Sequence, residues 1–252
     1  MALLEISGLG VVFGGLAALT AVSLQVEAGT VCALIGPNGA GKTTLFNAVS
    51  GYVRPSSGAV RMEAQAITGL PPHAVARRGI CRTFQNGGVF GSMTVLENVL
   101  TGLHQTTPSS VVGTLFGLPR DRAAEREATE RARAALAPMG LAPLADRRAK
   151  ELSFGQQRMV EITRALIARP RLLLLDEPAV GLSAGERDAL AIALRALAAD
   201  GIAVLLVEHV IDLVMAVSDR IFVLNHGELL ASGPPAEIRA NPAVLEAYLG
   251  AT

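Results

Sequence analysis

The sequence predicts an α/β fold around a mostly parallel sheet, and three observations lead to this prediction. Two unbroken apolar runs, at 31–36 and 172–175, are typical of strands that are covered on both faces. From residue 172 onwards, apolar strand patterns alternate with helical patterns, as they do where helices wrap a parallel sheet. A glycine-rich turn at 36–41 leads from the first run into a helix, which is a common strand-to-helix connection in such folds.

The remaining elements follow in chain order. Short strands are expected at 3–6 and 22–29, and the second of these alternates between polar and apolar residues, as a half-exposed strand does. A short helix with proline at its start is expected at 71–79, and a strand that ends in Gln85 at 80–85. The C-terminal strands are expected within 172–176, 201–209, 220–225 and 227–233, and the C-terminal helices within 184–200 and 210–219.

The pattern of the sequence changes between about residues 86 and 150. A helical stretch at 94–103 and a loop at 106–113 precede an alanine-rich segment with interleaved charges at 119–140. Oppositely charged residues stand four apart in that segment, as in Glu127 and Arg131, so one face of this helix is expected to be solvated. We interpret the region as an inserted helical subdomain.

Composition excludes several classes of function. The 252 residues carry 22 basic and 22 acidic side chains, which argues against nucleic-acid binding driven by overall charge. Cys32 and Cys81 match no metal or redox spacing and are expected to be buried small residues. No apolar run reaches the roughly 18 residues of a membrane span, and no basic residue precedes Lys42 as in a signal peptide. The chain is therefore expected neither to cross a membrane nor to be exported by the usual route.

The stretch GPNGAGKT at 36–43 fits the phosphate-binding pattern G-x-x-x-x-G-K-[ST] in full, between a predicted strand and a predicted helix. Backbone N–H groups at such a helix start cradle phosphates, while Lys42 reaches the β- and γ-phosphates and Thr43 supplies an oxygen to Mg²⁺. The alternative is a glycine turn that precedes Lys-Thr by chance. The expected nucleotide-binding residues here are Gly36, Pro37, Asn38, Gly39, Ala40, Gly41, Lys42, Thr43 and Thr44.

Polar residues end three further apolar runs, where the strand ends of an open α/β sheet face a ligand. Asp176 is expected to hold Mg²⁺, and Glu177 to orient and deprotonate an attacking water. Gln85 is expected to reach the metal and the water, and His209 the γ-phosphate. The alternative for each of these residues is an ordinary strand end.

The stretch ELSFGQQRMV at 151–160 has the pattern of a second helix start suited to an anion. Ser153 followed by Gln156 forms a capping box, so a plain helix cap is the simpler interpretation. Both interpretations can hold together, because a capped helix start still presents backbone N–H groups.

Taken together, GPNGAGKTT, RTFQN, LSFGQQ, LLLLDEP and VEH resemble the motifs of the nucleotide-binding subunits of ATP-binding cassette (ABC) transporters, in the same order along the whole chain. The resemblance implies a P-loop NTPase (RecA-like) core with a mostly parallel sheet, an N-terminal antiparallel β-subdomain and an inserted α-helical subdomain. Residues 1–85 and 159–252 would form the core, and about 86–158 the helical subdomain that carries the signature motif.

The resemblance also implies that two such subunits face each other head to tail around ATP. Ser153 and Gly155 N–H groups, with Gln156, would then bind the γ-phosphate of ATP held on the partner. Phe13 resembles the aromatic residue that stacks on adenine, with a place in the core as its alternative. Two residues depart from the family pattern: Phe154 stands where most members have glycine, and Ser183 where many have aspartate.

The C-terminal stretch that ends in NPAVLEAYLG, and the long insertion, are similar to the ATP-binding subunits of branched-chain amino acid importers. The expected partners are a second ABC subunit in a homo- or heterodimer, transmembrane permease subunits and, indirectly, a solute-binding protein. The expected location is the cytoplasmic face of the inner membrane, and no nucleic acid is expected. The alternatives are the ATPase of an export or lipid-extraction system and a soluble ABC ATPase such as a cluster-assembly factor.

Overall fold

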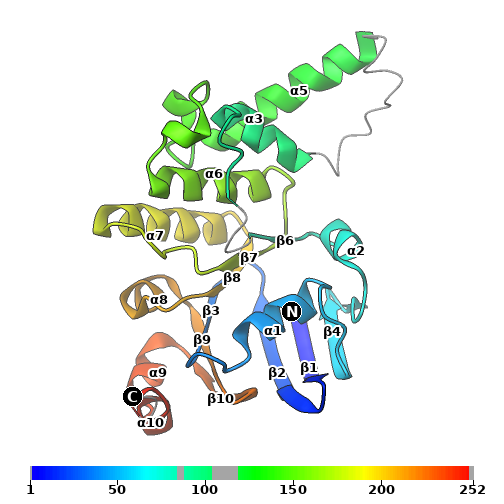
Figure 1. Cartoon of the computed structure of the whole chain (residues 1–252), viewed down its shortest axis with the longest axis vertical. Coiled ribbons are helices and arrows are strands. Elements are labelled where there is room, and N and C mark those ends of the chain that lie inside the picture. Colours follow the sequence, from blue (N-terminus) through cyan, green and yellow to red (C-terminus); the bar gives the residue numbers. More distant parts are fainter. Residues whose placement is uncertain (1, 84–87, 104–118, 250–252) are drawn as a thin grey trace. The chain divides into compact units, whose positions relative to one another are not determined.

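The computed structural model describes residues 2–83, 88–103 and 119–249 (Figure 1). The chain forms two compact units. The first comprises Met1–Arg82, Arg171–Val180 and Arg187–Thr252, and the second Thr83–Pro170 and Gly181–Glu186. Among the described residues, no helix combines the length and the apolarity needed to cross a membrane.

A six-stranded sheet in the order β10-β9-β3-β8-β7-β6 forms the centre of the first unit. Five of its strands are parallel, and only the edge strand β10 runs antiparallel to its neighbour. All residues of β3, β7 and β8 are buried, which agrees with their unbroken apolar sequences. The strands are β3 (Val31–Ile35), β6 (Ile80–Arg82), β7 (Leu172–Asp176), β8 (Ala203–Val207), β9 (Arg220–Asn225) and β10 (Glu228–Gly233).

A second, antiparallel sheet in the order β2-β1-β4-β5 contains the N-terminal residues. Its strands are β1 (Ala2–Phe13), β2 (Leu16–Glu27), β4 (Ser57–Met62) and β5 (Gln65–Ala66). The first two strands are longer than the segments expected at 3–6 and 22–29. Register shifts interrupt their pairing at several points, so the polar–apolar alternation is lost between regular stretches.

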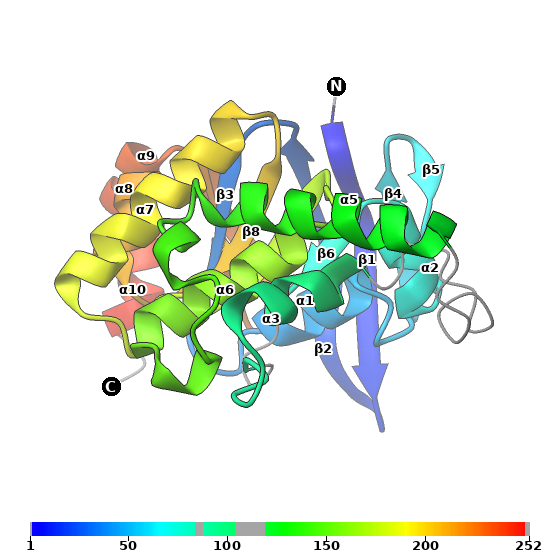
Figure 2. The ribbon, with the colours of Figure 1, turned by 90° about the horizontal axis from the view of Figure 1, so that it is seen from above.

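One hydrophobic cluster joins the two sheets of the first unit. It contains strand residues such as Leu4, Val26 and Leu205, together with Phe46 and Leu45 of the helix α1 (Lys42–Val49). Figures 1 and 2 show α1 and the antiparallel sheet on one side of the six-stranded sheet, with α8 and α9 on the other. The other helices of this unit are α2 (Pro72–Arg77), α7 (Ala184–Ala199), α8 (Ile211–Val217), α9 (Pro235–Ala240) and α10 (Pro242–Leu249); the first turn of α7 belongs to the second unit.

The second unit is helical, as expected for the insertion. Its α-helices α3 (Val95–Leu100), α5 (Pro119–Leu136) and α6 (Phe154–Leu166) pack against one another, and short 3₁₀ turns lie at Thr101–Leu103, Ala142–Leu144 and Ala149–Glu151 (Figure 2). Buried residues of all three helices, such as Val99, Leu136 and Ile162, form its core. The whole of α6 lies in this unit, which extends to Pro170.

Both cysteines are free thiols. Cys32 is buried and Cys81 is half-buried, and burial raises the pKa of each to about 11. At neutral pH these thiols are therefore protonated, which makes them weak nucleophiles and metal ligands. The expectation of a buried small residue is confirmed for Cys32, whereas Cys81 is only half-buried.

Candidate functional site

The register of the parallel sheet brings three of the predicted segments to one edge. Leu34 pairs with Val207, and Val207 pairs with Asp176, so strands β3, β8 and β7 end at the same level. The chain continues from these ends into the glycine-rich loop at 36–41, into Glu177, and into Glu208 and His209. This is the edge at which open parallel sheets bind their ligands.

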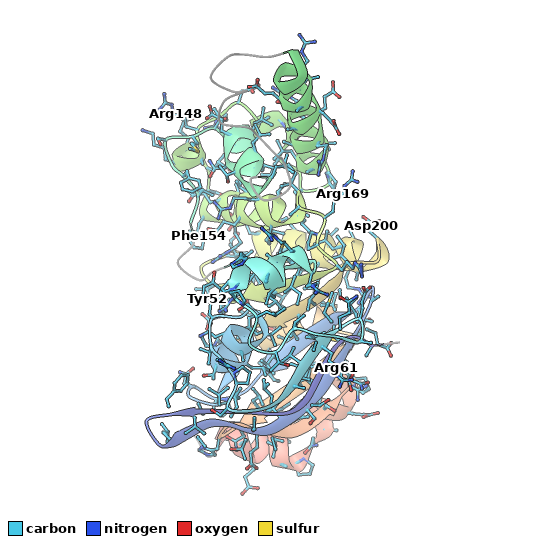
Figure 3. The ribbon with its side chains drawn as sticks, turned by 90° about the vertical axis from the view of Figure 1, so that its right-hand side faces the viewer. Tyr52, Arg61, Arg148, Phe154, Arg169 and Asp200 are labelled. Atoms are coloured by element: carbon cyan, nitrogen blue, oxygen red, sulfur yellow. The ribbon has the colours of Figure 1, made fainter. Side chains whose placement is uncertain are left out.

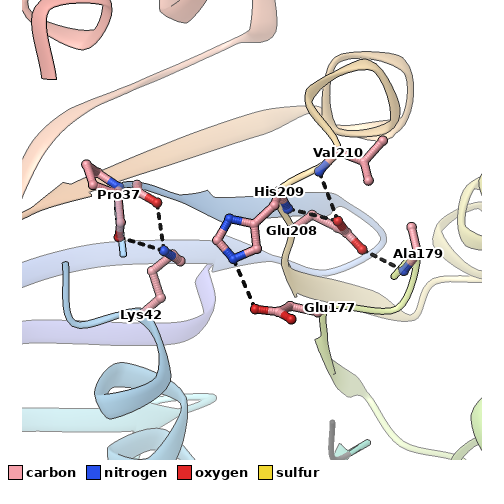
Figure 4. A network of polar contacts seen from close by, with 8 residues as sticks. Pro37, Lys42, Glu177, Ala179, Glu208, His209 and Val210 are labelled. Atoms are coloured by element: carbon pink, nitrogen blue, oxygen red, sulfur yellow. Dashed lines mark hydrogen bonds and ion pairs between the residues drawn. The ribbon is translucent and has the colours of Figure 1, made fainter. Parts of the chain in front are cut away.

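The glycine-rich loop wraps around the side chain of Lys42. The Lys42 ammonium donates hydrogen bonds to the carbonyl oxygens of Gly36, at 2.7 Å, and Pro37, at 2.9 Å (Figure 4). Burial lowers the pKa of Lys42, and the carboxylates of Glu177 and Asp176 oppose this effect. The loop thus holds a buried cation at its centre, with Asn38 and Gly39 exposed at its tip.

Two glycines allow the loop to fold this closely. Gly36 has a φ of 153°, and a Cβ at this position would lie 2.1 Å from the carbonyl oxygen of Leu224. Gly41 has a φ of 101°, and its Cβ would lie 2.7 Å from the carbonyl oxygen of Ala18. Because Gly41 is the N-cap residue of α1, no side chain caps the first turn of that helix. Its backbone N–H groups are thus available to an anion such as phosphate.

Glu177 and His209 face each other across the ends of β7 and β8. The Oε1 atom of Glu177 lies 3.0 Å from Nε2 of His209 (Figure 4). Glu177 has a left-handed backbone conformation, with a φ of 49°, which is uncommon for a residue with a side chain. Such strained residues cluster at functional sites, where the surrounding structure holds them in place.

Glu208 holds this arrangement together, and sequence reasoning did not single it out. Its buried carboxylate accepts hydrogen bonds from the backbone N–H groups of Ala179, at 2.6 Å, His209, at 2.8 Å, and Val210, at 3.1 Å (Figure 4). It therefore ties the segment after Glu177 to the segment that carries His209. The only sequence signal was a glutamate at the end of a fully apolar strand, where a buried charge needs partners.

Asp176 is 5 % exposed and pairs with a buried arginine. Nη2 of Arg82 lies 2.8 Å from Oδ2 of Asp176, and Nη1 of Arg82 donates hydrogen bonds to Asn47 and Ser50 on and just after α1. The ion pair thus fastens the end of β7 to the helix that follows the phosphate loop. Gln85 lies outside the described residues.

Among the described side chains there is no cluster of three or more histidines, cysteines or carboxylates that could hold a metal alone. Mg²⁺ does not require such a cluster, because it is usually bound through one or two protein oxygens, water and the phosphates of the substrate. The buried carboxylate of Asp176 and the exposed hydroxyl of Thr43 are oxygen donors of the required kind.

The predicted signature residues lie in the second unit, at the start of α6. The capping box is confirmed: the Ser153 hydroxyl accepts from the Gln156 N–H, and the Gln156 side chain accepts from the Ser153 N–H. Gly155 is buried. Phe154, which stands where glycine was expected, is 53 % exposed and lies at the helix start (Figure 3). Its ring packs against Gly181, and the Arg158 guanidinium lies 5.9 Å from the ring centre.

Phe13 ends β1, next to the turn that leads into β2. Its side chain is 49 % exposed, so the interpretation of Phe13 as a core residue is wrong. An exposed ring beside a turn can stack on a flat ligand.

Comparison with known proteins agrees with the geometry. A family model described as "ABC transporter" matches residues 19–180, and one described as "Branched-chain amino acid ATP-binding cassette transporter" matches residues 228–252. The chain is 47 % identical over 249 residues to the high-affinity branched-chain amino acid transport ATP-binding protein BraF of Pseudomonas aeruginosa, covering 98 % of each chain. It is 43 % identical over 251 residues to the corresponding protein LivG of Escherichia coli, again covering 98 % of each.

Solved structures of similar chains have the same fold. A nucleotide-free ATP-binding cassette from an ABC transporter superimposes with a TM-score of 0.87 at 35 % identity, covering 98 % of this chain and 99 % of that one. The ADP conformation of an ATP-binding cassette gives the same TM-score and identity, covering 99 % of each chain. The expected α/β cassette fold is therefore confirmed.

Proposed function

Because the chain belongs to the ABC transporter family and is an ATPase of that family, we propose that it drives an importer of branched-chain amino acids or related small polar solutes. One structural observation carries the proposal for ATP hydrolysis: the in-register ends of β3, β7 and β8 bring the phosphate loop, the carboxylates of Asp176 and Glu177, and His209 to one edge. The cargo is proposed from the names of the relatives, which span nearly the whole chain.

In this proposal each residue at the sheet edge has a separate task. The N–H groups of the loop and of the start of α1 bind the phosphates of ATP, and Lys42 turns its ammonium from the loop carbonyls to the β- and γ-phosphates. Thr43 and Asp176 hold Mg²⁺, which neutralises charge on the phosphates when bound. Phe13 stacks on the adenine ring.

Glu177 is proposed to act on the attacking water. Its carboxylate accepts a proton from the water as the water oxygen bonds to the γ-phosphorus and the bond to the bridging oxygen of ADP breaks. His209, 3.0 Å from Glu177, fixes the orientation of that carboxylate and contacts the γ-phosphate. Gln85 keeps its proposed place beside the metal and the water.

The complete site is proposed to need a second cassette subunit. Ser153, Gly155 and Gln156 at the start of α6 bind the γ-phosphate of ATP that is held on the partner. A solved dimeric cassette with ADP and phosphate, 26 % identical to this chain, supports this arrangement. The dimer would bind permease subunits at the cytoplasmic face of the inner membrane, and a solute-binding protein would deliver the cargo.

The cargo is tested by purifying the complex from its native membrane and reconstituting it in vesicles. We expect ATP-dependent uptake of labelled leucine, isoleucine or valine, and a co-purifying binding protein that holds one of these amino acids. Uptake of none of them, together with a binding protein loaded with a different class of solute, would show that the cargo assignment is wrong while leaving the ATPase assignment in place.

The shared site predicts an effect in trans. Replacing Ser153 by alanine removes one hydrogen-bond donor to the phosphate, which we expect to reduce turnover at the affected site by roughly 10- to 100-fold. In mixed dimers in which one subunit carries Ser153→Ala and the other Lys42→Ala, both changes fall on the same composite site. The other site should therefore keep hydrolysing ATP in single-turnover assays. Loss of both sites in such dimers would contradict the shared-site arrangement.

A further inference from the structure

A carboxylate of the same chain occupies the anion-binding start of α6. Glu186, in the first turn of α7, accepts hydrogen bonds at Oε1 from the Ser153 hydroxyl, at 2.8 Å, and from the Gly155 N–H, at 3.2 Å. These are the donors that the proposed function assigns to the γ-phosphate on the partner. All three residues belong to the second compact unit.

The carboxylate of Glu186 is in close contact with the start of α6 and uses the hydrogen-bond donors there. A Cβ at Gly155 would lie 2.3 Å from Oε1 of Glu186, so the carboxylate rests directly against the backbone at the helix start. The Ser153 hydroxyl already accepts from the Gln156 N–H, and its single proton points to Glu186. In this state neither Ser153 nor Gly155 has a hydrogen left to offer a phosphate oxygen.

The second carboxylate oxygen binds a different segment. Oε2 of Glu186 accepts from the Ser183 N–H, at 3.0 Å, and from the Ser183 hydroxyl, at 2.9 Å. The hydrogen bonds to the two oxygens together hold the pKa of Glu186 below its usual value. The bond from the Ser183 backbone has the largest effect, and the bond from the Ser153 side chain the next largest. The group at the start of α6 is therefore an anion at neutral pH.

We propose that Glu186 is an internal competitor for the γ-phosphate, which must displace it from Ser153 and Gly155 before two subunits close around ATP. The inference rests on the proposed function, since it concerns the same composite site. Two anions cannot share these donors, because like charges a few ångströms apart repel each other. A γ-phosphate has more charge and more acceptor oxygens than a carboxylate, so ATP can displace Glu186, whereas ADP has no group to do so. Glu186 thereby raises the ATP concentration needed for the two subunits to close, and it increases the selectivity of this closure for ATP over ADP.

A capping role at α7 is the competing explanation. Ser183 followed three residues later by Glu186 is the pattern of a capping box, and the Glu186 N–H lies 3.4 Å from the Ser183 hydroxyl. That role uses only the contacts at Oε2, however, and leaves the two contacts at Oε1 unexplained. The two roles differ in outcome: loss of a cap only destabilises the chain, whereas loss of a competitor favours the ATP-bound dimer.

The test compares full-length chains that all carry Glu177→Gln, so that ATP is bound without turnover. ATP is titrated with Mg²⁺, and dimer formation is followed by light scattering. We expect Glu186→Gln, which keeps the shape and removes the charge, to lower the ATP midpoint of dimerisation roughly five- to tenfold, because a charge-assisted contact no longer opposes closure. Asp188→Asn is the matched control, since it makes the same charge change on an exposed residue of α7 and should leave the midpoint unchanged.

Glu186→Asp provides a second variant if glutamine weakens the start of α7 too far, as thermal unfolding would reveal. It keeps the charge, but its shorter side chain cannot reach Ser153 and Ser183 together, so the midpoint should again fall. An unchanged or raised midpoint in either folded variant overturns the role of Glu186 as a competitor, while dimerisation with ATP still supports the proposed function. If every variant binds ATP yet none dimerises, the proposal that two copies of this chain close around ATP is wrong. The inference about Glu186 is then wrong as well.

Discussion

Replacing Glu177 by glutamine is expected to slow ATP hydrolysis by roughly 10²- to 10⁴-fold, the range for loss of a positioned general base. Glutamine has nearly the same shape and can keep the contact with Nε2 of His209, which lies 3.0 Å from the carboxylate. It cannot, however, accept a proton from the attacking water. ATP binding should be preserved, because the phosphate loop and Lys42 are untouched.

Because Glu177→Gln should keep ATP binding but lose hydrolysis, we expect it to trap the ATP-bound state. A chain that binds ATP but does not cleave it should accumulate as an ATP-bound dimer, which size-exclusion chromatography with nucleotide analysis would detect. Phosphate release under steady-state conditions measures the loss of turnover. Glu228→Gln, at an exposed position on β10, controls for the charge change and should hydrolyse ATP at the normal rate. Near-normal turnover in the Glu177→Gln chain would exclude this residue as the base.

The sheet of the first unit was predictable because its signals are local. The strands β3, β7 and β8 are buried on both faces, and such burial requires an unbroken apolar run that is legible in the sequence. Their polar followers, Glu177 and His209, could be placed at one edge because parallel strands share the direction of their ends. The capping box of Ser153 and Gln156 is equally local, since its members are three residues apart.

The strands β1 and β2 show where local signals fail. Gly8 and Gly10 lie inside β1, and glycine is a poor strand former, so the sequence predicted only a short strand at 3–6. Pairing with β2 on one side and β4 on the other extends the strand through these glycines. Tertiary pairing therefore overrides the weak propensity, and the register shifts mark the places where it does so.

Glu208 and Glu186 were missed for a different reason. The contact of Glu208 with the Ala179 N–H joins residues 29 apart, and that of Glu186 with the Ser153 hydroxyl joins residues 33 apart. No recurring motif connects either glutamate with these distant partners; the capping-box pattern of Glu186 indicates only its neighbour Ser183. A buried charge implies that partners exist, but only the fold determines which backbone N–H groups reach it.

Replacing Lys42 by alanine is expected to weaken ATP binding on the order of 10²-fold or more, because two charge-assisted contacts to phosphate are lost. The effect differs in kind from that of Glu177→Gln, since binding and turnover should disappear together. Lys42 is only 7 % exposed, so water and salt screen its charge little at the centre of the loop. Isothermal titration with ATP and Mg²⁺ measures the change.

Lys42 also stabilises the loop itself, so its replacement by alanine has two effects. Its ammonium satisfies the carbonyl oxygens of Gly36 and Pro37, and alanine would leave both without this donor. Lys42→Arg separates the two tasks, because it keeps the charge, but its wide planar guanidinium does not fit the seat of a compact ammonium. Both variants should therefore lose ATP affinity, the arginine variant with its charge intact.

Lys150→Ala provides the control, because this lysine is exposed in the second unit and should leave ATP affinity unchanged. Thermal unfolding without nucleotide then tells whether the loop survives the substitution at Lys42. If the Lys42→Ala chain is folded and binds ATP as tightly as the unchanged chain, the ammonium holds only the loop carbonyls together. The backbone N–H groups at the start of α1 would then carry phosphate binding alone.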